Sequence, residues 1–174
     1  MKYFHVLFFS MLLYSCDKKD PTPVEPTYDG KITAELNGAP WNAVVYAVRN
    51  ASAPSLMTIT CRNYHEHTRI DEQCVFNNIP ITPGTYRIPT DPPNTGPNTF
   101  MRASFFMNDY DVILAHYVVL DNDFNTLEII SYDSISNEIR GTADFTFLVK
   151  TKDDVNKPDT IRLKNGIFNG RVIN

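Results

Sequence analysis

Apolar and polar residues alternate through most of the chain beyond residue 28. In the segment 139–149 the odd-numbered positions are apolar or small, and most of the even-numbered positions from 140 to 150 are polar. Successive side chains of a β-strand point to opposite faces of its sheet, so this alternation predicts a strand with one buried face.

The same pattern recurs along the domain, and no segment keeps a helical period over three turns. Twelve prolines fall mostly between the alternating runs, and six of them lie between positions 80 and 97. Asn37-Gly38 predicts a tight turn, because both residues tolerate positive φ. About nine or ten short strands predict an all-β fold, a single antiparallel β-sandwich with an up-and-down β-barrel as the alternative. The strands are expected at 31–36, 41–49, 56–64, 70–77, 100–108, 112–120, 126–133, 138–150 and 160–168.

The first fifteen residues read as a secretory signal peptide. Lys2 is followed by a nearly continuous apolar run from position 3 to 14. This run is shorter than the roughly 20 residues that a membrane-spanning helix needs, and it fits the apolar region of a signal peptide that is removed.

Leu13-Tyr14-Ser15-Cys16 resembles a bacterial lipobox. The resemblance implies that Cys16 carries a diacylglyceryl group, that signal peptidase II cuts before it, and that its amine is acylated, with palmitate as an expected acyl chain. One acyl chain binds a membrane only marginally, whereas two or three form a stable anchor. The alternative is that Cys16 is an ordinary thiol behind an ordinary signal peptide.

Charge and proline follow the cysteine at once. Residues 17–20 read Asp-Lys-Lys-Asp, which resembles the export tags of Bacteroidota surface lipoproteins, and residues 21–26 hold three prolines. Proline at this density keeps a chain extended. We therefore expect a disordered tether at 16–27 and one β-domain at 28–174.

The net charge argues against one class of partner. The whole chain carries −4, and removal of the signal peptide, which holds Lys2 and no acid, changes the side-chain total to −5. Proteins that bind nucleic acid carry basic patches, so none is expected as a partner. The acyl chains are the only expected membrane contact.

Four short motifs occur in order along the domain: Asn37-Gly38-Ala39-Pro40-Trp41, Pro83-Gly84-Thr85-Tyr86, the segment 139–147 and Lys164-Asn165-Gly166-Ile167-Phe168. Together they resemble a family of small Bacteroidota lipoproteins with the pattern NGxxW, PGTY, SGTFSF and NGxF. In this chain Arg140 and Ala143 depart from that pattern. The resemblance implies a lipoprotein with a β-rich domain, and it transfers no catalytic residue.

Cys61 and Cys74 flank a predicted hairpin whose tip lies near His67 and Thr68. Pairing about that tip places Cys61 opposite Cys74 and Ile59 opposite Phe76. Opposed strand residues have Cα atoms about 4.5–5.5 Å apart, within reach of a disulfide. Because exported proteins meet an oxidising environment, we expect a bridge, with two buried free thiols as the alternative.

Two segments hold possible metal ligands. His65 and His67 would share one face of a strand, but zinc needs three or four ligands, and a solvated hairpin tip is the favoured interpretation. Asp121, Asp123 and Asn125 look like half of a calcium loop, yet Thr126 and Tyr132 stand where an EF-hand needs Gly and Glu. A polar turn is favoured there, and no cofactor is expected.

Aromatic residues offer a possible glycan surface, since exposed rings stack on sugars in carbohydrate-binding modules, although most rings of a β-domain belong to its core. No GxSxG elbow and no phosphate-binding glycine loop is present. The candidates for stacking are Trp41, Tyr46, Tyr64, Tyr86, Tyr110 and Tyr117.

The expected function is that of a non-enzymatic binding or accessory module with a glycan or an envelope protein as partner. The protein is expected at the outer membrane, lipid-anchored on the periplasmic or the cell-surface face. Two alternatives are a glycan hydrolase on a β scaffold, which needs two carboxylates about 5–10 Å apart, and a purely structural envelope protein.

Overall fold

The computed structural model describes residues 30–90, 100–120 and 125–173, and its regular elements are all β-strands. The all-β prediction is therefore confirmed. The signal peptide, Cys16 and the tether lie outside the described residues. Within the described part of the chain, no helix has the length and apolarity needed to cross a membrane. The strands are β1 (Gly30–Leu36), β2 (Ala39–Arg49), β3 (Leu56–His65), β4 (Ile70–Pro80), β5 (Gly84–Arg87), β6 (Arg102–Asp109), β7 (Val112–Val119), β8 (Thr126–Tyr132), β9 (Glu138–Lys152) and β10 (Thr160–Ile173).

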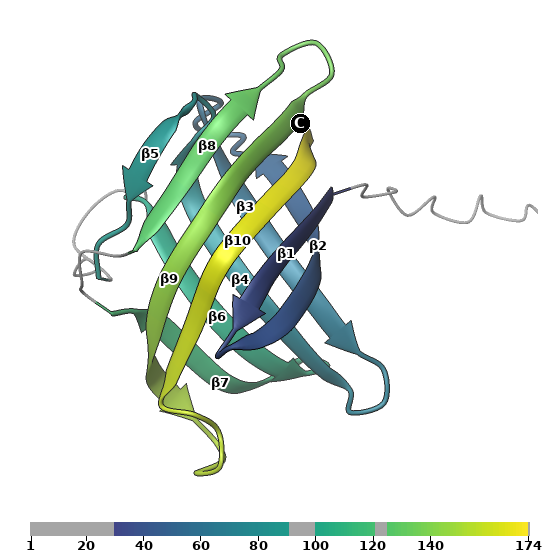
Figure 1. Ribbon diagram of the computed structural model, residues 1–174, viewed down its shortest axis with the longest axis vertical. Coiled ribbons are helices and arrows are strands. Elements are labelled where there is room, and N and C mark those ends of the chain that lie inside the picture. Colours follow the sequence, from purple (N-terminus) through teal and green to yellow (C-terminus); the bar gives the residue numbers. More distant parts are fainter. Residues whose placement is uncertain (1–29, 91–99, 121–124, 174) are drawn as a thin grey trace, which may run out of the picture.

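One hydrogen-bonded sheet holds all ten strands and closes into a ring (Figure 1). Neighbouring strands around the ring run β1, β2, β3, β4, β6, β7, β9 and β10, and β10 returns to β1. The long strand β9 pairs with β8 through its first half and with β7 through its second half, and β5 extends the sheet beyond β8. All pairs are antiparallel except a short parallel contact between β10 and β2. This arrangement is consistent with a sandwich or a barrel-like fold.

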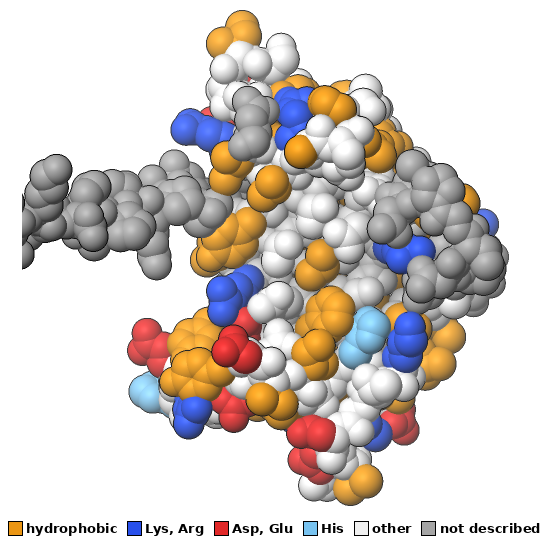
Figure 2. Space-filling view, turned by 180° about the vertical axis from the view of Figure 1, so that it is seen from behind, with side chains coloured by type: hydrophobic (Ala, Val, Ile, Leu, Met, Phe, Trp, Pro, Cys, Tyr) orange, Lys and Arg blue, Asp and Glu red, His pale blue; other side chains and the backbone are white. Residues whose placement is uncertain are grey.

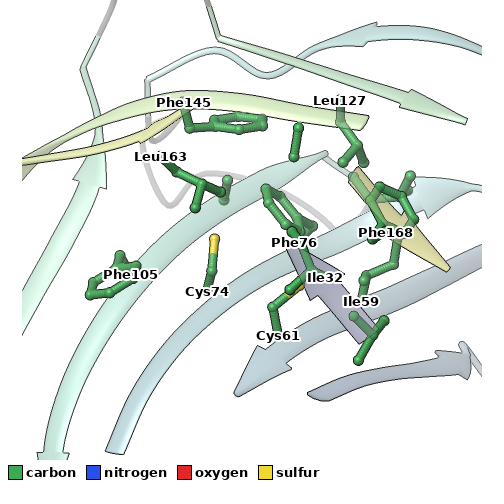
Figure 3. Close-up of a cluster of buried hydrophobic side chains, with 14 of the residues drawn as sticks. Ile32, Ile59, Cys61, Cys74, Phe76, Phe105, Leu127, Phe145, Leu163 and Phe168 are labelled. Atoms are coloured by element: carbon green, nitrogen blue, oxygen red, sulfur yellow. The ribbon is translucent and has the colours of Figure 1, made fainter. Parts of the chain in front are cut away.

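The core fills the inside of the ring, because each strand sends alternate side chains inward. The odd-numbered residues of β9 from Ile139 to Phe147 are buried, as the alternation predicts. Figure 3 shows Phe145 and Leu163, from β9 and β10, pointing toward Cys74 and Phe76 of β4. The rings of Phe76 and Phe145 lie 5.0 Å apart between centroids. Side chains from opposite walls therefore meet in one apolar interior.

The backbone geometry requires glycine at two positions, Gly38 and Gly141. Asn37 and Gly38 form the two-residue turn between β1 and β2 with φ of 53° and 83°, which confirms the predicted turn. Gly141 on β9 faces the ring of Phe168 on β10, and a Cβ at Gly141 would overlap the carbonyl oxygen of Glu128. No side chain fits there without movement of a neighbouring strand.

The structure corrects the sequence prediction at several strand ends. The segment Gly84–Arg87 forms strand β5, which was not predicted because its four residues lie among prolines and glycine. Strand β10 continues to Ile173, beyond the expected end at 168, because Gly170, Arg171 and Val172 remain paired or buried along β9 and β2.

The predicted register of the β3–β4 hairpin is confirmed, but the predicted disulfide is not found. Cys61 lies opposite Cys74 and Ile59 opposite Phe76. Both thiols are free and buried. The pairing of Cys61 with Cys74 brings their Cα atoms close enough for a disulfide. A bridge also requires the two Cα–Cβ bonds to point toward each other. Here the side chains project side by side into the core (Figure 3), where a free thiol packs as a small apolar group.

Candidate ligand-binding groove

A groove of about 680 Å³ lies on the outer face of strands β1 to β3. Figure 2 shows this side of the molecule hollowed above the projecting β3–β4 hairpin, which lies at the lower left. Aromatic, amide and charged side chains line the groove together, a composition suited to a ligand that has both apolar faces and hydroxyl groups. The lining residues are Lys31, Ile32, Thr33, Asn42, Ala43, Val44, Tyr46, Arg62, Asn63, Tyr64, Asp71 and Tyr110.

Strand register places the outward side chains in rows across the groove. Val44 pairs with Lys31 on one side and with Arg62 on the other. Tyr64 pairs with Asp71 of β4. These residues alternate with the buried residues of the same strands, so the period of two that builds the core also builds the groove.

An ion pair forms the floor of the groove at β3 and β4. The Nε of Arg62 donates to both carboxylate oxygens of Asp71 at 2.9 Å, and the Nε2 of Gln73 donates to Oδ2 at 2.6 Å. The Asp71 side chain is only 3% exposed, whereas that of Arg62 is 48% exposed. The hydrogen bond to Asp71 raises the pKa of Arg62 above its ordinary value. Arg62 is thus held in place while part of it still faces the groove.

Two hairpin turns form the rim of the groove. The guanidinium carbon of Arg69, in the β3–β4 turn, lies 4.2 Å from the centroid of the Tyr110 ring, in the β6–β7 turn, which is cation–π geometry. Arg69 and Tyr110 have φ of 60° and 51°, a left-handed backbone that is uncommon for bulky residues. Arg69 also pairs with Asp109 at 3.6 Å. Strained residues that hold each other in place cluster at functional sites, which makes this rim a candidate contact surface.

Tyr64 stands next to this rim. It is 42% exposed and Tyr110 is 60% exposed, so both rings face solvent. Partial desolvation is the main cause that raises the pKa of Tyr64, and the neighbouring Tyr110 is the second. Tyr64 therefore stays a neutral phenol well above physiological pH. A neutral hydroxyl can both donate and accept a hydrogen bond.

The structure divides the six aromatic candidates into two groups. Trp41 and Tyr117 are buried in the core, and Tyr86 is half-buried with its hydroxyl bonded to Thr82. The other three, Tyr46, Tyr64 and Tyr110, line the groove. The sequence named all six, and its alternation already places Tyr46 on the face opposite Trp41 and Tyr64 on the face opposite Cys61. The missed feature was Arg69, and its contact with Tyr110 depends on the β4–β6 pairing.

The two candidate metal segments have different outcomes. In the calcium candidate, Asp121 and Asp123 lie outside the described residues. Asn125 is buried, its Oδ1 accepts from the backbone amide of Thr146 at 2.8 Å, and its amide donates to the carbonyl of Leu120. Both ends of the Asn125 side chain are therefore hydrogen-bonded to backbone groups, as in a polar turn.

The two histidines do not share one environment. His65 ends β3 with its Nε2 3.2 Å from Glu72, while His67 is exposed in the turn. No group of three or more His, Cys, Asp or Glu residues within the described ranges is placed to hold a metal ion.

Comparison of the chain with protein-family models, with curated proteins and with solved structures gave no match.

Proposed function

We propose that this protein is a lipid-anchored cell-envelope module that binds a glycan, without cleaving it, in the groove over β1 to β3. The observation that carries the proposal is the set of three tyrosines gathered on one concave surface. Sugar rings present apolar C–H faces that pack on aromatic rings, and their hydroxyl groups bond to amide and charged side chains.

The polar lining supports the same ligand class. Asn42, Lys31 and Thr33 supply donors and acceptors on one side of the groove, and Arg62 supplies donors on the other. With Lys31 and Arg62 against Asp71, the lining carries a small positive excess, which suits a neutral or acidic glycan.

The proposed anchor is Cys16, acylated at the outer membrane after removal of residues 1–15. Intact mass of the membrane-extracted protein tests this part. We expect an N-terminus at Cys16 with the mass of two or three acyl chains, and no lipid in a Cys16→Ala variant. Cleavage elsewhere without lipid would contradict the anchor but not the groove.

Binding is tested on a glycan array with the folded protein and a Tyr64→Ala variant. Loss of an exposed stacking ring is expected to weaken binding about tenfold, since such contacts contribute about 0.5–1.5 kcal/mol beyond area burial. The control is Ile135→Ala in the β8–β9 turn at the opposite end of the molecule, an exposed apolar side chain outside the groove. Equal binding by Tyr64→Ala and Ile135→Ala would contradict the proposal.

The alternative enzymatic proposal is a glycan hydrolase. It needs two carboxylates, and among the described residues that line the groove the one carboxylate is Asp71, which is bonded to Arg62 and Gln73. Incubation with the bound glycan separates the two proposals, because only a hydrolase releases new reducing ends.

An envelope protein is the alternative partner. It is favoured by a second hollow, of about 500 Å³, in which Ile130 and Ile167 are exposed beside Arg140. If this hollow binds the partner, Ile167→Asp should abolish crosslinking on whole cells while Tyr64→Ala leaves it intact.

A further inference from the structure

Four inward-facing side chains form a polar cluster at the hairpin end of the ring. Asn63 and His65 lie two and four residues beyond the buried Cys61 on β3, Glu72 lies two residues before Cys74 on β4, and Trp41 approaches from β2. Alternation places all four on the inner side of the sheet. The cluster therefore borders the groove, which Asn63 also lines, while His65, Glu72 and Trp41 lie outside the groove's lining.

Three of these side chains bring their polar atoms within hydrogen-bonding distance of one another. The Nε2 of His65 lies 3.2 Å from Oε2 of Glu72 and 3.1 Å from the amide nitrogen of Asn63, and that nitrogen lies 3.5 Å from Oε2 of Glu72. Rotating the Asn63 amide by half a turn puts its oxygen at nearly the same place, since the two ends of the amide have the same shape.

A triangle of this size is close to one face of a metal coordination shell, with two of its edges, 3.1 and 3.2 Å, slightly shorter than in a zinc site. Zinc binds nitrogen and oxygen at about 2.0–2.2 Å, so tetrahedral geometry separates two ligand atoms by about 3.3–3.6 Å. The backbone register explains the match: Asn63 is directly opposite Glu72, and His65 follows two positions later on the same face.

We propose that Asn63, His65 and Glu72 form a site for a divalent first-row transition metal such as Zn²⁺. An imidazole nitrogen with carboxylate and amide oxygens suits these ions better than Mg²⁺ or Ca²⁺, which prefer oxygen throughout. Three protein ligands leave a coordination position open to water or to a donor from a bound molecule.

Trp41 supports this site from behind. Its Nε1 donates to Oε2 of Glu72 at 2.8 Å, the kind of contact that orients a metal-binding carboxylate. Trp41 is buried, whereas the His65 side chain is 46% exposed and that of Glu72 is 16% exposed. The site is fixed on its inner side and open to solvent on the other.

The chain holds a single tryptophan, so this arrangement carries its own reporter. Titration of the folded protein with Zn²⁺, followed by Trp41 fluorescence and by calorimetry, should show saturable binding of one ion. Mg²⁺ at the same concentrations should give no signal.

Four variants test the ligands. We expect weaker Zn²⁺ binding, by about tenfold or more, in His65→Ala and in Glu72→Gln, which keeps an acceptor for Trp41. Loss of a contact that only supports a ligand already lowers metal affinity about 10–100-fold. Asn63→Asp should strengthen binding by adding a charge. The matched control is His67→Ala, two positions from His65, which should bind as the parent protein does.

Two results would overturn the proposal in proteins shown by melting to be folded. One is the absence of saturable Zn²⁺ binding in the parent protein. The other is equal weakening by His67→Ala and none by Glu72→Gln, which would assign the ion to the histidine pair instead.

Discussion

Strands β3 and β4 serve two environments that differ in almost every physical respect. On the inner side, Cys61, Cys74 and Phe76 are fully buried among apolar side chains. On the outer side, Arg62 and Tyr64 face a groove and meet polar partners. The comparison teaches that a step of one residue along a strand moves a side chain from the core to the groove. Substitutions on the two sides should therefore have separable effects on stability and on the proposed binding.

The largest effect is expected inside the ring. Phe145→Ala should lower the free energy of unfolding by about 3–5 kcal/mol, because its ring is fully buried against Phe76 and Phe147 and leaves a cavity. Urea denaturation measures this value. The control is Leu148→Ala, an exposed position on the same strand, which should change stability by less than about 0.5 kcal/mol. Similar losses for both would contradict the inner and outer assignment.

The next effect comes from the backbone contact at Gly141. Gly141→Ala should destabilise the protein by about 1–3 kcal/mol, because the added methyl meets the carbonyl of Glu128 and the ring of Phe168. Thermal unfolding at equal protein concentration checks this. Where alanine fits a strand without a clash, it usually raises the melting temperature relative to glycine. Such an increase would contradict the close approach of Glu128 and Phe168 to Gly141.

A loss of stability in the same range is expected at the floor of the groove. Arg62→Ala removes both bonds from Nε to Asp71 and leaves a buried carboxylate with Gln73, at a cost of about 1–3 kcal/mol. Arg69→Ala, which removes an exposed pair with Asp109, should cost less than about 1 kcal/mol. Denaturation of the two variants side by side tests the difference, and equal losses would show that Asp71 does not depend on Arg62.

The smallest effect on stability at neutral pH is expected from ionisation of the buried thiols of Cys61 and Cys74. Burial raises the pKa of Cys61 from 9.0 to about 12 and that of Cys74 well above its ordinary value. Folding therefore favours the protonated thiols, and this stabilisation is complete below pH 9 and is lost as the pH rises from 9 toward 12. A Cys61→Ala/Cys74→Ala variant should lose less stability over that range.

Alkylation tests the same thiols chemically. The folded protein should react with iodoacetamide at neither cysteine at pH 8, and the unfolded protein should react at both, since the thiolate is the nucleophile. Failure of the unfolded, unreduced protein to react would instead indicate a bridge.

The fold was largely predictable because its information is local. Alternation located nine strands, and Asn37-Gly38 and the pairing of Cys61 with Cys74 set two hairpins correctly. The closure of the sheet was not predictable, because the pairing of β10 with β1 and the shared edge of β9 join segments far apart in the sequence.

The candidate sites were less predictable for the same reason. The sequence placed Tyr64 and Tyr110 among possible stacking residues, but their meeting depends on the β4–β6 register. It paired His65 with His67, whereas the structure pairs His65 with Glu72 across the hairpin. The predicted β3–β4 register already places Asn63 opposite Glu72, so this neighbour could have been found from the sequence, whereas the approach of Tyr110 to Tyr64 could not.

The most direct test of the groove uses Tyr110→Gly, because this change removes the ring while suiting the backbone. Tyr110 occupies a left-handed position in a two-residue turn, where glycine is preferred. Glycan affinity and melting temperature should be measured together for this variant and the parent protein. We predict an unchanged or higher melting temperature with binding about tenfold weaker. Unchanged affinity in the folded variant would contradict a binding site at this rim.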